Sequence, residues 1–490
     1  MSRVAPDLPT SLVFAILPPM ASTATNTIRQ TLACCVETDC TVGQLLASLR
    51  GQAGLFALES SCNTGGYGRF SIVGADPIDE LGHHLQSTDA GEHDALSILA
   101  SVTSAIPRIE NPGLPFVGGW VGFIPYESGE AVVGIALSDA SAMRFALYDA
   151  AAIFDHATDR WTVLAVDFPQ SFTPAIERID LWKRRLTRAA GVSTEPGESS
   201  NRKSIASARS NMTKGEYFDK VERAIEYIRA GDIYQVNLTQ RFTVEAAVDP
   251  LDLYLRLQRV NPADYSAFIA YDDQAILSAS PELFVQLACD GSIVTRPIKG
   301  TRPRIGDDDA MRDELKNSEK DRAELTMIVD LLRNDMGRVC RFGSIDVTHA
   351  AQVETHPTVH HLVATIVGCV NENVTAVDVL RAMFPGGSIT GCPKIRAMEI
   401  IRELEPTPRE VYCGAIGFLG ADGSMNMNIA IRTMIHRRDR VHVYAGGAIT
   451  ADSRADDEYN ESLSKAKGMF RALGIGEFDL LENQLTPNGN

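Results

Sequence analysis

The sequence predicts an α+β protein, because strand-like and helix-like periodicities both recur along it. Short strand-like runs, such as RWTVLAV at 160–166, fill the first part of the chain, and capped helical patterns alternate with strands after residue 212. Residues 191–211 are rich in Ser, Gly, Pro and charge, which predicts a linker or long loop. We therefore expect a poorly ordered leader (1–30), an N-terminal region (31–190), this linker (191–211), a second region (212–473) and a loose tail (474–490).

Composition narrows the class of protein. The chain has 490 residues, 44% of them hydrophobic and 22% charged, which is enough for a large core. The net charge is −17 and no basic stripe stands out, which argues against nucleic acid as a partner. The nine cysteines are scattered without a C-x-x-C pair, which argues against a disulfide framework and indicates a cytoplasmic protein. No apolar run reaches the roughly 18 residues of a membrane span, so no membrane association is expected.

The second region opens with a well-marked helix and strand. Thr213 and Glu216 have the T-x-x-E spacing of a capping box, apolar residues follow at helical spacing, and Gly231 predicts the end of the helix. The next run, IYQVNLTQRF at 233–242, alternates apolar and polar residues as a strand does. Its polar face, which includes Gln235, is either solvated or lines a site.

Two acidic residues fall on the apolar side of a predicted helix. In NSEKDRAELTMIVDLLRND (317–335), apolar residues at helical spacing define one face. At about 100° per residue, Asp321 lies inside this face and Glu324 lies on its flank. Two carboxylates so placed repel each other, and burying them without partners is costly.

A second predicted helix has the same feature. In DDEYNESLSKAKGMF (456–470), Glu458, Glu461 and Lys465 line the flank of the apolar face. One interpretation is a pair of solvated acidic turns, with an ordinary Glu461–Lys465 ion pair. The other is that the two helices supply oxygen ligands to a divalent cation, most naturally Mg²⁺ bridging to an anionic substrate. The spacing leaves both interpretations open.

Two further motifs do not fit common ligand sites. PGGSITGCPK (385–394) departs from a phosphate-binding loop, because Cys392 occupies the position of the required lysine. Its glycines, and those of YAGGAIT (444–450), can instead offer backbone amides to a carboxylate, or serve as simple turns. His356 and His360 have a spacing seen in zinc sites, but the surrounding residues favour a strand and no third ligand is evident.

Together these motifs resemble those of the chorismate-utilising enzymes. The similar runs include GDIYQVNLTQRF, SASPELF, PIKGTRPR, NSEKDRAELTMIVDLLRNDMGRV, FPGGSITGCPKIRAMEIIRELEP, AGGAITADS and EYNES, in family order across 213–470. The resemblance implies an anthranilate-synthase-like fold, a sandwich of curled antiparallel sheets with outer helices. It also makes 212–473 the chorismate-binding catalytic region.

The resemblance implies roles for most of the polar residues noted above. Chorismate is a dicarboxylate that the family binds through Mg²⁺. By motif the metal-binding acids are Glu324 and Glu461, with Asp321 and Glu458 supporting them; Asp321 is shorter than the glutamate of several relatives. The matching substrate contacts are Arg432, which clamps a carboxylate, His361 beside the reacting ring, and Tyr412, Ser388, Lys465, Gly446, Gly447 and Gln235.

Lys299 separates the branches of the family. On its own it reads as a solvated lysine on an edge strand. Within the resemblance, the PIKG lysine replaces the alanine of the anthranilate-forming branch and implies a nucleophile that attacks C2, so that ammonia then enters at C4. Glu282 matches the general acid for the departing C4 hydroxyl. Gln235 replaces the lysine base of the water-adding branch, which indicates ammonia as the nucleophile.

The expected function is therefore amination of chorismate at C4. The alternatives are the anthranilate-forming branch and a non-catalytic regulatory subunit that binds tryptophan or chorismate. Because no glutaminase motif with a cysteine nucleophile is evident, a separate glutamine amidotransferase subunit is expected to supply ammonia.

Overall fold

The computed structural model describes residues 31–60, 68–82, 95–135, 142–195, 208–304 and 306–476. The predicted leader, residues 196–207 of the predicted linker and residues 477–490 of the predicted tail lie outside these ranges. No helix within them is long and apolar enough to cross a membrane.

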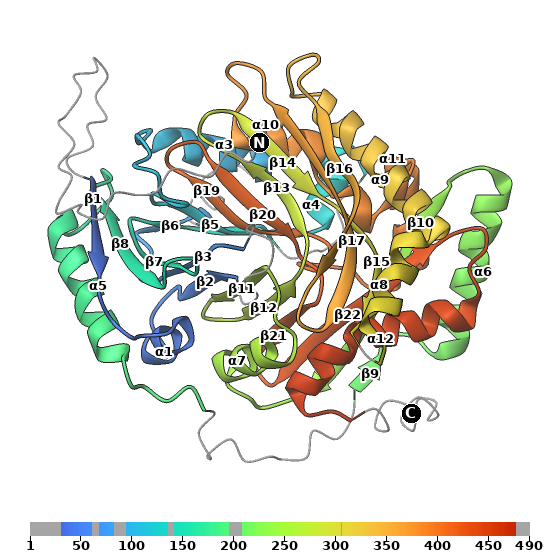
Figure 1. Cartoon of the computed structure of the whole chain (residues 1–490), viewed down its shortest axis with the longest axis horizontal. Helices are drawn as coiled ribbons and strands as arrows, with labels where there is room; N and C mark the ends of the chain where they lie inside the picture. Colours follow the sequence, from blue (N-terminus) through green and yellow to red (C-terminus); the bar gives the residue numbers. More distant parts are fainter. Residues whose placement is uncertain are drawn as a thin grey trace.

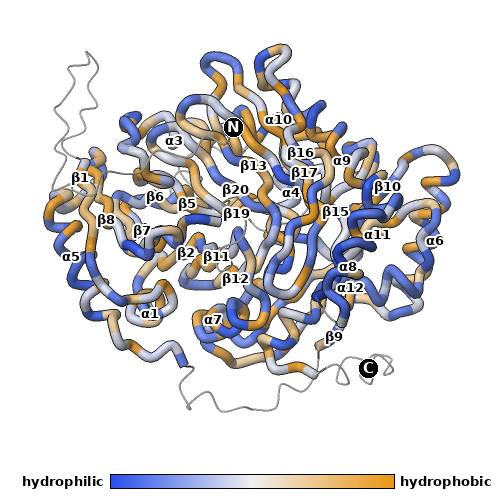
Figure 2. The backbone as a smooth tube through the Cα atoms, viewed as in Figure 1, coloured by the Kyte–Doolittle hydropathy of each residue, from blue (hydrophilic) through white to orange (hydrophobic). Residues whose placement is uncertain are grey.

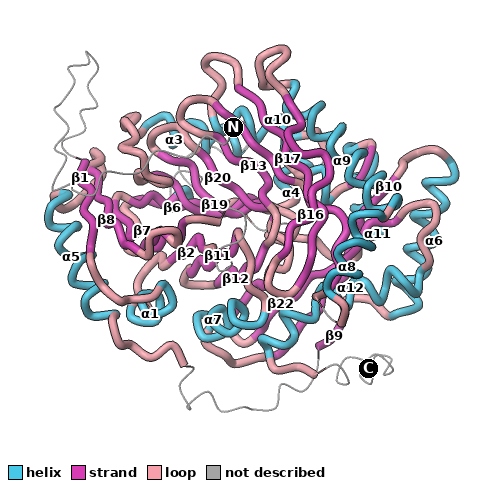
Figure 3. The backbone as a smooth tube through the Cα atoms, viewed as in Figure 1, coloured by secondary structure: helices cyan, strands magenta, loops and turns pink. Residues whose placement is uncertain are grey.

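Two antiparallel sheets form the framework (Figure 1, Figure 3). The first sheet has the strand order β1 (Thr31–Val36), β8 (Arg160–Val166), β7 (Ala150–Asp155), β3 (Phe70–Gly74), β2 (Phe56–Glu59), β11 (Tyr265–Ala270), β12 (Ala275–Ser280), β21 (Thr433–Arg437), β22 (Arg440–Ile449), β10 (Gln235–Glu245) and β18 (Gly391–Cys392), with β9 (Ala208–Ser210) beside β10. The second has the order β15 (Ile298–Pro303), β17 (Val359–Cys369), β14 (Ser292–Arg296), β13 (Leu283–Leu287), β20 (Met425–Ile429), β19 (Ala415–Gly420), β5 (Gly119–Ile124), β6 (Arg144–Tyr148) and β4 (Asp79–Glu80), with β16 (Asp346–Thr355) beside β17.

Helices surround these sheets, and Figure 1 shows most of them around the margin of the molecule. They are α1 (Val42–Ser48), α3 (Ala95–Ala105), α4 (Glu127–Val132), α5 (Ala175–Ala189), α6 (Lys214–Ala230), α7 (Pro250–Val260), α8 (Asp308–Asn317), α9 (Glu319–Gly337), α10 (Ala376–Met383), the 3₁₀ turn η1 (Gly387–Ile389), α11 (Lys394–Leu404) and α12 (Ala455–Leu473). The α+β class is confirmed.

The helix boundaries follow from local chemistry. The predicted capping box at the start of α6 is present in both directions, and Gly231 ends the helix in the left-handed conformation. The side chain of Ser318 caps α9 by accepting the Asp321 amide. The end of α12 at Gly474 uses the same left-handed glycine stop as α6.

Alternation along the strands separates two cores. In β12, the side chain of Ile276 belongs to one buried cluster, and those of Ala275, Leu277 and Ala279 belong to the other. The first cluster joins residues of both sheets, and the second joins the first sheet to α1, α5, α7 and α12. Figure 2 shows hydrophobic and hydrophilic stretches interspersed along the chain.

Both sheets combine strands from the two regions that the sequence distinguishes. In the first sheet β2 pairs with β11, and in the second β5 pairs with β19. The two regions of the chain therefore complete each other's sheets.

Two local expectations were wrong. The predicted linker extended to residue 211, but β9 already pairs with β10 because the chain re-enters the first sheet there. His356 and His360 do not share one strand: His356 lies in the turn between β16 and β17, and its amide bonds to the Val359 carbonyl.

Candidate active site

Lys299 lies on β15 at an irregularity in its pairing with β17. The next residue, Gly300, has φ +78°, and a side chain there would meet Asp321 at 2.8 Å, so only glycine lets α9 pack this close. The Lys299 side chain is only partly exposed, and its Nζ donates to the Ser388 carbonyl at 3.3 Å. Burial lowers the pKa of Lys299, and the nearby charge of Lys465 lowers it further, against the opposing effect of Glu324.

Glu282 faces the same segment of η1. Its side chain is buried, and the Ser388 hydroxyl donates to its Oε1 at 2.6 Å. Burial raises the pKa of Glu282 to about 7, although Ser388 and Lys299 act in the opposite direction. A carboxyl group in this state can hold a proton near neutral pH and still release it.

Close packing fixes η1 between these groups. A side chain on Gly386 would meet Ile429 at 2.5 Å, and one on Gly387 would meet Leu331 at 2.5 Å. The amide of Asn237 donates to the Ser388 carbonyl at 2.9 Å. The glycines of this loop therefore serve packing; their predicted use as carboxylate-binding amides stays a prediction.

The acids of α9 and α12 converge beside β22. A side chain on Gly447 would lie 3.0 Å from Glu458 Oε2 and 3.5 Å from Glu461 Oε1, so this strand passes directly under both carboxylates. Burial raises the pKa of Glu324, and the charge of Glu461 raises it further, so the acids of the two helices interact. The sequence could not show that these side chains lie near one another, and the structure brings them close enough for their charges to interact.

Lys465 neutralises part of this acidic cluster. Its Nζ lies 2.7 Å from Glu461 Oε1 and donates to the Gly446 carbonyl at 3.0 Å. Burial alone would raise the pKa of Glu461, but Lys465, together with Lys320 and Lys299, leaves that pKa below its ordinary value. Glu461 is therefore ionised at neutral pH and available as a ligand.

The acids suit a hard cation that a substrate also ligates. Glu458 is buried; its Oε1 accepts from Ser453 at 2.6 Å, whereas its Oε2 has no hydrogen-bond partner among the described residues. Asp321 instead pairs with Arg302 at 3.0 Å, which suits a supporting role. Within the described ranges no three acid, histidine or cysteine side chains stand close enough to enclose a metal. Mg²⁺ commonly takes one or two carboxylates together with substrate oxygens and water, so the donors fit it.

His361 and Arg432 form another part of the site. His361 is buried, and its Nδ1 lies 2.9 Å from the Thr301 hydroxyl. Burial holds the pKa of His361 well below its usual value and Arg432 lowers it further, so the imidazole is neutral. Arg432 has φ +50° and donates to Asn261 Oδ1 at 3.3 Å.

Gln235 and Tyr412 differ in how they are held. Gln235 is fully buried, and neither its amide nitrogen nor its amide oxygen has a partner within the described chain. Such a group is costly unless a ligand satisfies it, which favours a binding role. Tyr412 is buried and stacks on Tyr444, with ring centroids 5.3 Å apart. Hydrogen bonds and charge interactions thus connect Lys299, Glu282 and Ser388 with the acids of α9 and α12. Tyr412 instead packs against Tyr444.

The sequence analysis did not predict the buried ion pair of Arg409 and Glu405, which lies next to η1. Arg409 is buried, its Nη1 donates to the Ile389 carbonyl at 2.9 Å, and its Nη2 donates to the Asn237 carbonyl at 3.0 Å. Its guanidinium also binds both oxygens of Glu405, at 2.8 and 2.6 Å. The i,i+4 spacing of the two residues was the available signal, but such a spacing is usual on solvated surfaces as well.

The fold and this cluster of a lysine, a protonatable acid and paired carboxylates define a small-molecule enzyme site. The chain belongs to the family described as chorismate binding enzyme, whose model matches residues 58–471.

Curated relatives separate into two groups. The chain is 41% identical to aminodeoxychorismate synthase component 1 of Salmonella typhimurium, over 83% of this chain and 90% of that protein. It is 38% identical to anthranilate synthase component 1 of Streptomyces coelicolor, over 86% and 84%. Among solved structures, anthranilate synthase component I from Streptococcus pneumoniae superposes with a TM-score of 0.70 at 32% identity, covering 82% of this chain and 92% of that one.

Proposed function

We propose that this chain is the chorismate-aminating component of an aminodeoxychorismate synthase. It would convert chorismate and ammonia to 4-amino-4-deoxychorismate, a precursor of 4-aminobenzoate and folate. The names of several relatives at 35–41% identity support this assignment. The observation that carries it is Lys299, whose partly buried amine lies 3.3 Å from the Ser388 carbonyl while the Ser388 hydroxyl binds Glu282.

In the first step the neutral Lys299 amine forms a bond to C2 of chorismate. The two conjugated ring double bonds shift, from C1=C2 and C5=C6 to C1=C6 and C4=C5, and the C4–O bond breaks, with the Glu282 proton leaving on the hydroxyl as water. Glu282 regains a proton from the newly bonded nitrogen. The lowered pKa of Lys299 and the raised pKa of Glu282 support these protonation states.

In the second step ammonia forms a bond to C4 and the C2–N bond to Lys299 breaks. Both ring double bonds shift back, the incoming nitrogen loses a proton, and the departing lysine regains one. Overall, ammonia replaces the hydroxyl and one water is released. Gln235, whose amide is unpartnered among the described residues, is suited to orient ammonia but cannot activate water as a lysine base would.

Chorismate binding uses the remaining groups. Glu324 and Glu461 would hold Mg²⁺, with Asp321 and Glu458 supporting them; Mg²⁺ would supply positive charge for a substrate carboxylate in this acidic cluster. Arg432 would clamp a carboxylate, and His361, Tyr412, Ser388, Lys465, Gly446 and Gly447 would contact the ring and its substituents. Ammonia would come from a glutamine amidotransferase subunit, as the designation "component 1" of the relatives suggests, in the cytoplasm.

Anthranilate formation is the second candidate. It is favoured by a relative 43% identical over 55% of this chain, anthranilate synthase component 1 of Aquifex aeolicus. The two reactions differ in product, because anthranilate is aromatic and fluorescent whereas 4-amino-4-deoxychorismate is not aromatic.

The test is product identification with purified chain, chorismate, Mg²⁺ and ammonium chloride, in wild type and in Lys299→Ala. We expect 4-amino-4-deoxychorismate from wild type and at least about 100-fold slower formation from the variant, because a covalent nucleophile is lost. Circular dichroism controls for folding. Anthranilate as the product, or an unimpaired variant, would remove the assignment.

A further inference from the structure

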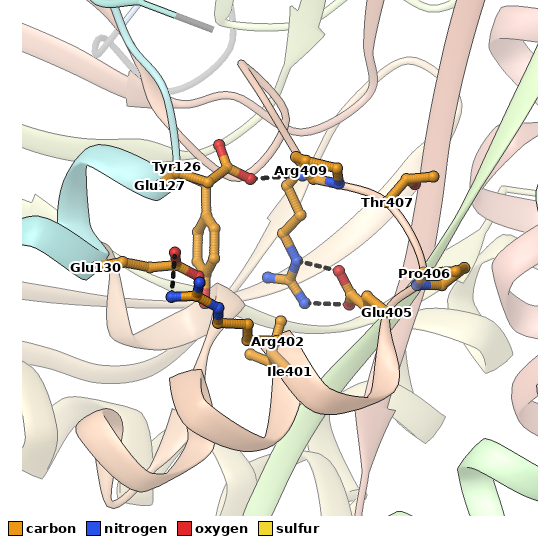
Figure 4. A pocket seen from close by; sticks show the side chains of 10 residues that line it. Tyr126, Glu127, Glu130, Ile401, Arg402, Glu405, Pro406, Thr407 and Arg409 are labelled. Atoms are coloured by element: carbon orange, nitrogen blue, oxygen red, sulfur yellow. Dashed lines mark hydrogen bonds and ion pairs between the residues drawn. The ribbon is translucent and has the colours of Figure 1, made fainter. Parts of the chain in front are cut away.

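Arg409 and Glu405 form a buried ion pair next to η1, and the reaction steps above give this pair no role. The side chain of Arg409 is 1% exposed and that of Glu405 is 5% exposed. Figure 4 shows the guanidinium joined to both carboxylate oxygens. The guanidinium carbon also lies 4.6 Å from the centre of the Tyr126 ring. The pair lines a cavity of about 210 Å³ between α4 and the end of α11.

Stability alone does not account for an ion pair in this position. Taking two charges out of water is costly, and well-packed apolar side chains of similar volume often stabilise a fold as well or better. Arg409 nevertheless uses four of its N–H donors: two bind Glu405, and two bind the carbonyls of Ile389 and Asn237, at 2.9 and 3.0 Å. The guanidinium therefore fixes two backbone segments that are distant in the sequence.

Glu405 and the backbone of Arg409 extend these contacts. The Oε1 atom of Glu405 accepts the amide of Thr239 at 2.9 Å, on the same strand as the Asn237 carbonyl that Arg409 binds. The carbonyl of Arg409 accepts the amide of Tyr412 at 3.1 Å. One ion pair thus connects β10, η1 and the turn that carries Tyr412, which are three segments of the candidate active site.

Ser388 lies between this ion pair and the reacting groups. Its carbonyl accepts the side-chain amide of Asn237 at 2.9 Å and the amine of Lys299 at 3.3 Å, and its hydroxyl donates to Glu282 at 2.6 Å. The carbonyl of the next residue, Ile389, is the one that the guanidinium binds. Two glycines precede Ser388, and glycine loses more conformational freedom on ordering than any other residue. The segment therefore depends on contacts such as these to stay in one place.

We propose that Arg409 is a positioning residue for the amination, and that with Glu405 it holds Ser388 where both reacting side chains can contact it. This role rests on the proposed function. A misplacement of about 1 Å in an active site can slow a reaction about 100-fold. The role requires a guanidinium, because a lysine ammonium is a point charge on a flexible stem and cannot present the same fixed fork of donors.

Crystal structures of the full chain, as wild type and as Arg409→Lys, test the role without reference to activity. The variant keeps the positive charge, and water in the adjoining cavity can solvate the released carbonyls, so the fold should persist. We expect the Ser388 hydroxyl to move beyond about 3.5 Å from the Glu282 carboxylate, outside hydrogen-bonding distance. Glu405→Gln, which removes the charge of the pair and keeps an oxygen for the Thr239 amide, is a milder second variant and should displace Ser388 as well. Ser388 at its wild-type position in both variants would overturn the proposal.

A double-mutant cycle tests whether Arg409 acts through Ser388. Arg409→Lys and Ser388→Ala should each lower kcat for amination about 10- to 100-fold. The double variant should be no slower than the slower single variant, because both changes remove the same contact with Glu282. Losses that multiply in the double variant would overturn the role, and so would a Ser388→Ala chain with the kcat of wild type.

The pH dependence of kcat separates positioning from a general loss of folded protein. The Ser388 hydroxyl favours the ionised form of Glu282 and so lowers its pKa, against burial, which raises it. Without that hydroxyl the pKa of Glu282 should rise further, and the fall of kcat at alkaline pH should move up by about half a pH unit in both single variants. Lys299 and Lys465 also face Glu282, and neither is changed. A smaller folded fraction would lower kcat without moving this fall, so an unmoved fall would overturn the proposal.

The matched control is Arg333→Lys, which makes the same change in an exposed ion pair with Asp330 on α9. It should leave kcat and its pH dependence as in wild type. If Ser388 is displaced in Arg409→Lys but wild type does not aminate chorismate at C4, the positioning is supported and the proposed function is removed. If Ser388 stays in place and wild type does aminate C4, only the positioning is overturned.

Discussion

At the scale of single residues, burial shifts the pKa values of two neighbouring side chains in opposite directions. Taking charge out of water lowers the pKa of Lys299 and raises that of Glu282 to about 7. Both groups are therefore biased toward their neutral forms, an amine that can attack and an acid that can donate. Ser388 contacts both of them, through its carbonyl and its hydroxyl.

This pair predicts a bell-shaped pH dependence of chorismate amination. The rate should fall as pH rises past about 7, because Glu282 then loses the proton that the departing hydroxyl needs. It should also fall at low pH, because Lys299 becomes protonated. Glu282→Gln should lower kcat by about 10²- to 10⁴-fold and remove the fall on the alkaline side. Steady-state rates between pH 5 and 9 measure this, and an alkaline limb that persists in the variant would contradict the role of Glu282.

At the scale of elements, the site depends on acidic side chains from two helices that pack on different strands. α9 packs against β15 and α12 against β22, and each helix contributes acids from the flank of its apolar face. Gly447 allows β22 to pass under Glu458 and Glu461, because a side chain there would touch the first at 3.0 Å. The helices thus hold carboxylates close together that would otherwise repel each other.

Loss of one of these acids should weaken metal-dependent binding. With Glu461→Gln we expect the affinity for chorismate in the presence of Mg²⁺ to fall about 10- to 100-fold, because a metal-binding carboxylate is lost. Affinity measured with a chelator present should not change. Isothermal titration with and without Mg²⁺ makes the comparison.

Asp457→Asn is the control for this change, since Asp457 lies on α12 as an exposed acid. It should bind chorismate as wild type does. Equal Mg²⁺ dependence in wild type and Glu461→Gln would count against the ligand role.

At the scale of the whole molecule, the two regions of the chain are not separable. Residues of β2 and β11 pair in the first sheet, and those of β5 and β19 pair in the second. Cutting the chain between the regions would leave β2, β5, β11 and β19 each with an unpaired edge, and would uncover apolar faces. The buried cluster between the two sheets also contains residues of both regions, so neither region has this core by itself.

A fragment of residues 208–490 should therefore not fold alone. We expect no cooperative thermal transition by circular dichroism, whereas co-expression with residues 1–195 should restore one. The full chain under the same conditions is the reference. A fragment that melts cooperatively and binds chorismate would show that the shared sheets are dispensable.

Helix caps and apolar periodicity predicted several elements of the second region, because these signals depend only on residues that are close in the sequence. The capping box of Thr213 and Glu216 and the glycine stop at Gly231 were confirmed, as was the buried face of α9 around Leu325 and Ile328. Arg409 was missed because its partners, Ile389 and Asn237, are distant along the chain. His356 was misplaced because strand propensity does not reveal where a hairpin turns.

The sequence by itself determined the class of fold and the chemical types gathered for the site, through periodicity, caps and motifs. Residue spacing placed acids beside the apolar faces of two helices. It could not decide whether these acids are solvated or paired, because spacing carries no information about distant contacts. Only the tertiary structure decided that the acids of α9 and α12 interact and that Ser388 of η1 contacts both Lys299 and Glu282. The reason is physical, because burial and charge proximity set the pKa values, and both arise only when remote segments pack together.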